Sequence, residues 1–163
     1  MRSPESKIMT LEEAAAWRND LRRRGLRLAV TNGCFDLLHR GHAEYLARAR
    51  ACADALLVAL NSDASVRAIK GPERPVVREA DRAFLVASLE AVDAVVVFAG
   101  AKPLDVFPAV RPDIYVKGGD YTEATTDREE YAVLKALGCE FRFIPFVPGF
   151  STTSTISRVR GQS

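Results

Sequence analysis

The two histidines of the chain stand three residues apart, in the run His39-Arg40-Gly41-His42. They follow a short apolar segment and precede an Ala/Arg/Leu-rich stretch that predicts a helix. Gly41 lets a ligand approach the backbone closely, and the amino end of a helix favours an anionic phosphate. Two imidazoles at this spacing therefore predict a phosphate site. A capping pair or a pair of core histidines is the plainer alternative.

A cluster of hydroxyl side chains offers a second phosphate-binding element. Ser151, Thr152 and Thr153 follow a Pro-Gly-Phe turn and open a short predicted helix that carries Arg158 and Arg160. Hydroxyls and free backbone N–H groups at a helix start bind phosphate, but the same residues are ordinary helix caps. The phosphate interpretation therefore depends on the histidine pair.

Two further loops each place a lysine beside glycine, which suits phosphate contact. One begins at Lys117 and runs to Asp127 without a helix or strand pattern, a length that is usually functional or disordered in a compact domain. The other begins at Asn61 and passes through Lys70 and Arg74. Solvated surface is the competing interpretation of these cations.

Apolar runs that alternate with helical patterns predict the elements that position these loops. Residues 56–60 and 95–97 are apolar on both faces, as in parallel strands covered by helices on each side. Ligands of such open sheets bind beyond the carboxyl ends of the strands. The sequence thus predicts an α/β fold, a three-layer α/β/α sandwich with a Rossmann-like parallel sheet. Strands are predicted near 28–31, 56–60, 94–98, 113–116 and 141–145, and helices near 10–25, 43–51, 79–91, 103–110 and 129–137.

Length and composition indicate one globular domain. The 163 residues fit a single unit, with a helical segment over 1–25 and an α/β core over 26–160. Of these residues, 48% are hydrophobic and 27% charged, and no apolar run is long enough for a membrane span. The amino terminus lacks the apolar core of a secretory signal, so we expect a cytoplasmic protein without membrane contact.

Charge and cysteine content exclude other classes. A net charge of +2 gives no broad basic surface, which argues against nucleic-acid binding. The three cysteines are odd in number and show no metal-ligand spacing, so we expect neither a disulfide framework nor a zinc site.

Together these segments resemble the cytidylyltransferase-like superfamily, whose HxGH and carboxyl-terminal Ser/Thr motifs flank a nucleotide triphosphate. Over about residues 7–158 the chain is similar to the branch that adenylates D-glycero-β-D-manno-heptose 1-phosphate. In some bacteria that domain is fused to a sugar kinase, and the absence of a kinase sequence predicts the stand-alone form. The resemblance rests on residues 31–36, 61–65, 89–93, 116–121 and 151–153.

The resemblance implies in-line attack by a sugar 1-phosphate oxygen on the α-phosphorus of ATP. Pyrophosphate leaves without a covalent enzyme intermediate, and the product is ADP-heptose for the inner core of lipopolysaccharide. His39 and His42 are the implied catalytic residues. Mg²⁺ would accompany ATP, held by phosphate oxygens and water, with no metal-binding residue assigned. The implied nucleotide- and phosphate-binding residues are Thr31, Asn32, Gly33, Phe35, Gly41, Lys117, Gly118, Asp120, Ser151, Thr152 and Thr153.

The resemblance implies the residues that bind the acceptor and the nucleotide base less directly. Asp36 would accept hydrogen bonds from heptose hydroxyls, and Lys7 and Lys70 would reach the acceptor phosphate. Adenine would lie over residues 117–120 and 146–150. A basic residue often found three places after the last Thr of the motif is replaced by Ile156, which leaves Arg158 or Arg160 as its substitute.

Relatives of this type suggest a homodimer or a higher homo-oligomer. Two alternatives remain open at this stage. One is a cytidylyltransferase that acts on glycerol 3-phosphate or a similar alcohol phosphate, and the other is a catalytically silent nucleotide-binding module.

Overall fold

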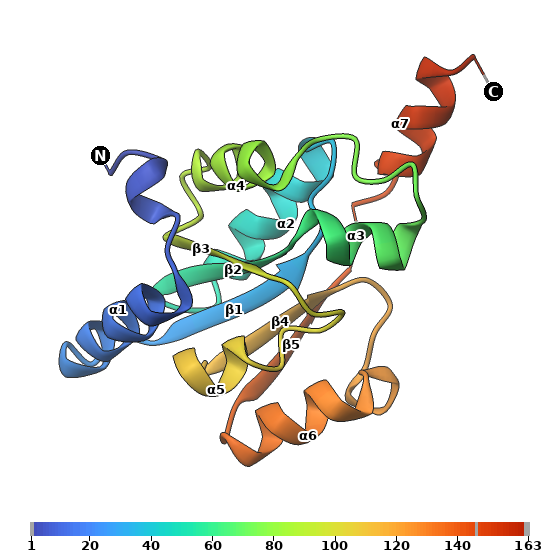
Figure 1. Ribbon diagram of the computed structural model, residues 1–163. Helices are drawn as coiled ribbons and strands as arrows, with labels where there is room; N and C mark the ends of the chain where they lie inside the picture. The colour runs from blue at the N-terminus through green and yellow to red at the C-terminus, as the bar shows by residue number, and fades with distance from the viewer. Residues whose placement is uncertain (1, 146, 162–163) are drawn as a thin grey trace.

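The computed structural model describes residues 2–145 and 147–161, and its centre is a five-stranded parallel sheet (Figure 1). The predicted α/β fold with a Rossmann-like parallel sheet is confirmed. The strands lie in the order β3-β2-β1-β4-β5. Their bounds are β1 (Leu28–Gly33), β2 (Ala55–Asn61), β3 (Ala94–Phe98), β4 (Ile114–Gly118) and β5 (Glu140–Ile144).

Helices cover both faces of the sheet. Buried side chains of α1, α5 and α6 pack in one apolar cluster and those of α2 and α4 in another, while α3 and α7 lie near the carboxyl edge of the strands (Figure 1). The helices are α1 (Leu11–Arg23), α2 (Arg40–Arg50), α3 (Asp63–Lys70), α4 (Glu79–Ala87), α5 (Val106–Val110), α6 (Arg128–Ala136) and α7 (Thr152–Val159), with 3-10 turns η1 (Glu5–Lys7) and η2 (Glu123–Thr125).

The double-faced core follows from the alternation of side chains along a strand. Every residue of β2 is buried; Leu57 packs in the cluster under α1, α5 and α6, whereas Leu56 and Val58 pack under α2 and α4. Successive side chains point to opposite faces, so a strand covered on both sides must be apolar throughout. No helix in the part of the chain that the structure describes is long and apolar enough to cross a membrane.

The strand order has its switch point between β1 and β4. The chain moves from β1 outward through β2 to β3, then returns to place β4 on the other side of β1. At such a point the loops after the two central strands diverge and leave a crevice in which ligands bind. The histidine motif follows β1 and the Lys-Gly-Gly-Asp segment follows β4, so the two segments meet there.

The predicted elements differ from the observed ones at several boundaries. Residues 63–70 were expected to be loop, but they form α3, because Ser62 caps the helix by accepting the Ser65 amide and Val66 is fully buried. The helix expected over 79–91 ends at Ala87. The segment 117–127, expected to lack structure, contains the short turn η2.

Two buried guanidinium groups connect loops at the two ends of the strands, Arg82 at the carboxyl ends and Arg18 at the amino ends. Arg82 of α4 donates to the Val77 carbonyl (2.9 Å), the Cys34 carbonyl (2.7 Å), the Asn61 carbonyl (2.8 Å) and the Asp63 carboxylate (2.8 Å). It therefore joins the loops that follow β1 and β2.

At the amino ends of the strands, Arg18 makes the corresponding contacts. Its guanidinium donates to the carbonyls of Leu26 (3.2 Å) and Val110 (3.1 Å) and to the Asp113 carboxylate (2.8 Å). Because a buried cation is stable only when its donors are paired, both arginines fix the backbone around them.

Replacement of Arg82 by Met should lower the free energy of unfolding by about 3 to 5 kcal/mol, because the buried Arg82 guanidinium no longer bonds the half-buried Asp63 carboxylate and the loop carbonyls lose their donor. Chemical unfolding monitored by circular dichroism measures the change. Arg78→Met is the matched control, since Arg78 lies on the surface at the start of the same helix. Equal stability losses in the two variants would contradict the assigned role of Arg82.

Candidate active site

The two histidines cap the start of α2 reciprocally. Nδ1 of His39 accepts a hydrogen bond from the His42 backbone N–H, and Nδ1 of His42 accepts one from the His39 backbone N–H, each at 3.4 Å. The two rings stack with their centroids 3.8 Å apart and their planes 14° apart. The capping pair that was considered as an alternative to a phosphate site is therefore present. It does not exclude the site, because it uses only one nitrogen of each ring.

This capping arrangement fixes the tautomer of each neutral imidazole. A ring nitrogen that accepts a backbone N–H carries no proton, so the proton resides on Nε2. Each half-buried ring then presents an Nε2–H donor. Two such donors at the amino end of a helix form an electropositive site without carrying a net charge.

Burial keeps both rings in the neutral form. Desolvation, followed by the nearby His39 ring, lowers the pKa of His42 to about 4, and desolvation lowers the pKa of His39. Two stacked imidazolium rings would also repel each other. At neutral pH both rings are therefore neutral hydrogen-bond donors.

The loop before α2 is held in an unusual backbone conformation. Phe35 and Leu37 have φ of 47° and 50°, in the left-handed region that such side chains rarely adopt. A Cβ atom on Gly41 would lie 2.9 Å from the Phe150 Cβ and 3.0 Å from the His39 ring, and one on Gly33 would lie 2.9 Å from the Phe35 ring. Gly33 and Gly41 are thus required by close packing around the histidines.

The hydroxyl segment at the start of α7 is brought to this loop. The Thr152 hydroxyl donates to the Asp36 carbonyl at 2.9 Å, and the Phe150 ring lies 6.1 Å from the His39 ring. Ser151 caps α7 by accepting the Ser154 amide, while Thr153 is exposed. The structure therefore unites the histidine and hydroxyl motifs that lie more than a hundred residues apart.

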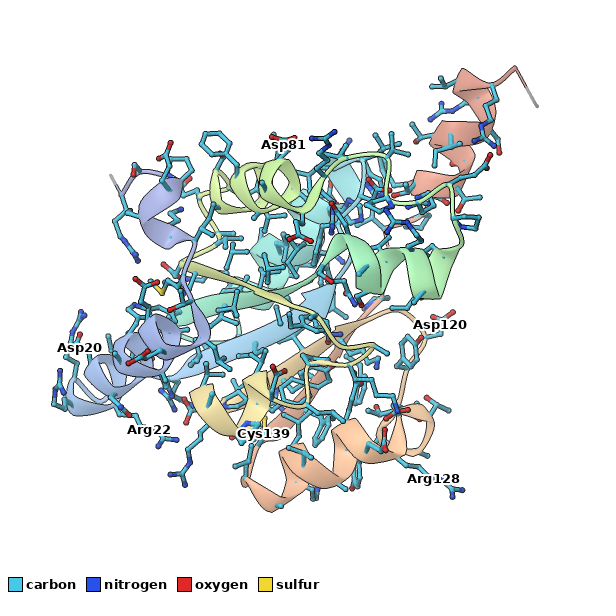
Figure 2. The ribbon with its side chains drawn as sticks, in the orientation of Figure 1. Asp20, Arg22, Asp81, Asp120, Arg128 and Cys139 are labelled. Atoms are coloured by element: carbon cyan, nitrogen blue, oxygen red, sulfur yellow. The ribbon has the colours of Figure 1, made fainter. Side chains whose placement is uncertain are left out.

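Lys117 lies near the end of β4, at the same end of the sheet, and its ammonium is held by an ion pair and a contact with an aromatic ring. Its ammonium lies 3.0 Å from the Glu130 carboxylate and 4.7 Å from the centre of the Tyr121 ring. Gly118 ends β4, and Asp120 is exposed on the loop beyond it (Figure 2). Phe146, part of the expected adenine site, lies outside the described residues.

Asp36 has a different environment from the one expected of a sugar ligand. Its carboxylate is buried and accepts hydrogen bonds from the Arg74 guanidinium (2.7 Å) and from the amides of Val76 (2.9 Å) and Val77 (3.0 Å). Burial opposes ionisation, but these hydrogen bonds and the Arg74 charge outweigh it and lower the pKa of Asp36. The structure thus makes Asp36 an anchor for residues 74–77.

Two other expected ligands also lie elsewhere. The Thr31 hydroxyl is buried and bonded to the Tyr45 hydroxyl at 2.7 Å, inside the layer between β1 and α2. Lys7 donates to the Leu89 carbonyl beside the amino end of β3, at the opposite edge of the sheet from the histidines (Figure 1). Strands of this length span about 3.3 Å per residue, so the Lys7 ammonium lies well beyond reach of the site in its own chain.

A cavity of about 250 Å³ opens between the loop that follows α3 and helix α7. Lys70, Arg74 and Arg160 supply its cationic lining, with Thr153 and Ile156 on the α7 side. Of the two arginines considered as substitutes for the usual basic residue, Arg160 lines this cavity and pairs with Glu73 at 3.1 Å, whereas Arg158 does not line it.

Sequence reasoning missed Arg82, Tyr115 and Glu130, which lie in elements whose patterns indicated packing alone. Arg74 was noted in a loop suited to phosphate contact, with solvated surface as the alternative, but its pairing with Asp36 was not foreseen. Cys34, Cys52 and Cys139 are free thiols. Among residues 2–145 and 147–161, no three His, Cys, Asp or Glu side chains gather where they could hold a metal.

The fold and this site define the class of protein. A sequence model described as cytidylyltransferase-like matches residues 30–160, and the chain belongs to that family.

Individual relatives and one solved structure show which members of the family the chain is similar to. The chain is 46% identical over 156 residues to the bifunctional protein HldE of Nitratiruptor sp. and to that of Geotalea uraniireducens, covering 96% of this chain but 32% and 31% of those proteins. It thus spans about a third of the length of the curated relatives it matches. A crystal structure of the lipopolysaccharide core biosynthesis protein from Thermoplasma volcanium matches with a TM-score of 0.62 at 26% identity, covering 76% of this chain and 98% of that one.

The neutral state of His42 predicts a pH dependence of stability. The unfolded chain binds a proton at this histidine near pH 6.5, whereas the folded protein resists protonation until about pH 4. The free energy of unfolding should therefore fall as the pH is lowered through this window and stay constant for this group above it.

Urea unfolding at several pH values across the window measures the slope, with His42→Gln as the comparison. The variant should show a shallower decline, because glutamine does not titrate and the carboxylate contributions are common to both proteins. Parallel slopes would refute the buried, neutral state assigned to His42.

Proposed function

We propose that the protein transfers the adenylyl group of ATP to D-glycero-β-D-manno-heptose 1-phosphate, giving ADP-heptose and pyrophosphate. The observation that carries the proposal is the stacked His39 and His42 pair, with its Nε2–H donors at the start of α2. Membership of the cytidylyltransferase-like family supports nucleotidyl transfer. The 46% identity to the HldE proteins and the likeness to a lipopolysaccharide core biosynthesis protein support the choice of acceptor.

The chemistry demands alignment and charge stabilisation rather than a protein nucleophile. In phosphoryl-type transfer an incoming oxygen attacks phosphorus in line with the leaving group, and negative charge is distributed over the phosphate oxygens. The two Nε2–H donors, the α2 amino end and the Lys117 ammonium would stabilise that charge. An oxygen of the acceptor phosphate forms the new bond to the α-phosphorus as the bond to pyrophosphate breaks.

The hydroxyls at the start of α7 would complete the triphosphate site. Ser151 and Thr153 are exposed, and Thr152 holds the segment against the histidine loop. Mg²⁺ is proposed only as the ion that accompanies ATP. Because Asp36 already accepts three hydrogen bonds and the described residues form no carboxylate cluster, no protein ligand and no reaction step are assigned to the ion.

The acceptor is proposed to bind in the cavity between the loop after α3 and helix α7. Its volume of about 250 Å³ suits a sugar phosphate, and Lys70 and Arg160 provide cations for the phosphate group. Arg74 adds a third cation whose position is set by Asp36. Asp36 would thus act on the acceptor through Arg74. A homodimer or higher homo-oligomer remains a prediction from the resemblance, and a cytoplasmic location remains a prediction from the character of the amino-terminal segment.

Substitution of His39 by Asn separates helix capping from catalysis. Asparagine is a favourable N-cap and retains an oxygen that accepts the His42 amide, but it lacks the Nε2–H donor. We expect kcat to fall by about 10² to 10³ with little change in the thermal unfolding midpoint. Pyrophosphate release measures turnover, and near-normal kcat in this variant would refute the catalytic role of His39.

Donor and acceptor choice tests the particular reaction. ATP with the heptose 1-phosphate should outperform CTP with glycerol 3-phosphate, by up to about 10⁴ in kcat/KM, because a polar pocket rejects an analogue that leaves its groups unpaired. A panel of nucleotides and phosphorylated acceptors, with pyrophosphate release as readout, measures the preference. Preference for CTP and glycerol 3-phosphate would establish the alternative transferase. Nucleotide binding without any turnover would establish a silent module.

A further inference from the structure

Glu130, a buried carboxylate that was not among the predicted site residues, is linked by polar contacts to two residues that were, Lys117 and Asn32. Glu130 on α6 is 4% exposed, and its Oε2 lies 3.0 Å from the Lys117 ammonium and 3.4 Å from the Tyr115 hydroxyl. The Tyr115 hydroxyl donates to Oδ1 of Asn32 at 2.6 Å. A continuous polar chain thus runs from α6 through β4 to the end of β1.

The distances show which acceptor the Tyr115 hydroxyl and the Lys117 ammonium each bond. Tyr115 has one hydroxyl proton, and the short distance to Asn32 shows where it goes, so Lys117 is the main donor to the Glu130 carboxylate. Since Oδ1 of Asn32 accepts from Tyr115, its NH2 group is turned the other way and presents two donors. The Lys117 ammonium keeps further N–H groups beyond the one that Glu130 takes.

Stability alone is a weak reason for this arrangement. Burial of an ion pair costs desolvation free energy that its attraction often only offsets, so an apolar residue on the inner face of α6 would serve packing equally well. The neighbouring helix positions 131, 133 and 134 already pack their apolar side chains against the core. The polar chain instead holds an ammonium and an amide at the carboxyl edge of β4 and β1, where the switch point lies.

We propose that Glu130 is a positioning residue for the nucleotide. It holds the Lys117 ammonium beside the Asn32 amide, which the Tyr115 hydroxyl orients, so that both present donors to the phosphate or sugar groups of ATP. This inference rests on the proposed function, because it requires that the site bind ATP. Glu130 itself touches no substrate.

Glu130→Gln keeps the shape of the side chain and removes its charge. ATP affinity, measured by calorimetry without acceptor so that no turnover occurs, should fall about tenfold. Glu129→Gln is the matched control, since Glu129 is the adjacent carboxylate, is exposed, and pairs with Lys102 on the surface. The control should leave the affinity unchanged.

A double-mutant cycle tests whether Glu130 acts through Lys117. In a Lys117→Met background, Glu130→Gln should reduce ATP affinity by less than about twofold, because the group that it positions is absent. Additive losses, or an unchanged affinity in Glu130→Gln alone, would overturn the proposal. If wild-type protein does not bind ATP, the proposed function fails instead.

Tyr115→Phe provides a second route if Glu130→Gln does not fold. Phenylalanine retains the ring and removes only the hydroxyl that orients Asn32. ATP affinity should fall about fivefold in a protein that still unfolds cooperatively. A folded Tyr115→Phe protein with wild-type ATP affinity would exclude the part of the proposal that concerns Asn32.

Discussion

The site depends on one buried cation. Where β1 and β2 end, the guanidinium of Arg82 donates to the backbone carbonyls of Cys34 and Asn61. The same group bonds Val77 and Asp63, so it joins the histidine loop, the start of α3 and the segment before α4. A planar group with donors in fixed directions imposes one relative placement on these loops. The positions of the proposed phosphate and acceptor subsites follow from that placement.

Around Arg82, two different buried carboxylates position the two halves of the candidate site. On the proposed acceptor side, the buried carboxylate of Asp36 accepts hydrogen bonds from Arg74 and two loop amides. On the proposed nucleotide side, Glu130 pairs with Lys117. Each carboxylate is hidden and each presents a cation toward the crevice. Both carboxylates thus fix the positions of cations that the proposed site would use to stabilise anionic phosphate groups.

The sequence predicted the strands and the histidine motif well, for clear physical reasons. A strand covered on both faces must be apolar throughout, and β2 shows this pattern without interruption. The HxGH motif was expected at a helix start, and α2 does begin within it, at Arg40 rather than near residue 43. Helix α3 was missed because it is short and polar, and its start depends on the single cap Ser62.

The candidate site differs from expectation where residue type does not reveal direction. The resemblance implied that Lys7 reaches the acceptor phosphate, but Lys7 bonds the Leu89 carbonyl, because the sequence does not show at which end of the strands a residue lies. Asp36 was correctly placed near the motif, yet its partners come from residues 74–77, about forty positions away. Arg82 and Glu130 occur in amphipathic helices, where a charge normally indicates a solvated face. Only tertiary packing shows that these two side chains point inward.

The reciprocal caps of His39 and His42 have an evolutionary consequence. Helix starts prefer Ser, Thr, Asp or Asn, so a histidine at the cap of α2 is not the choice that folding alone would select. A lineage that lost the need for the outward donors would drift toward those better caps without harming the helix. Such drift would change the motif first at position 39, and the same fold would persist. Under the proposed function, the residue at position 39 would therefore report whether selection acts on catalysis or on folding alone.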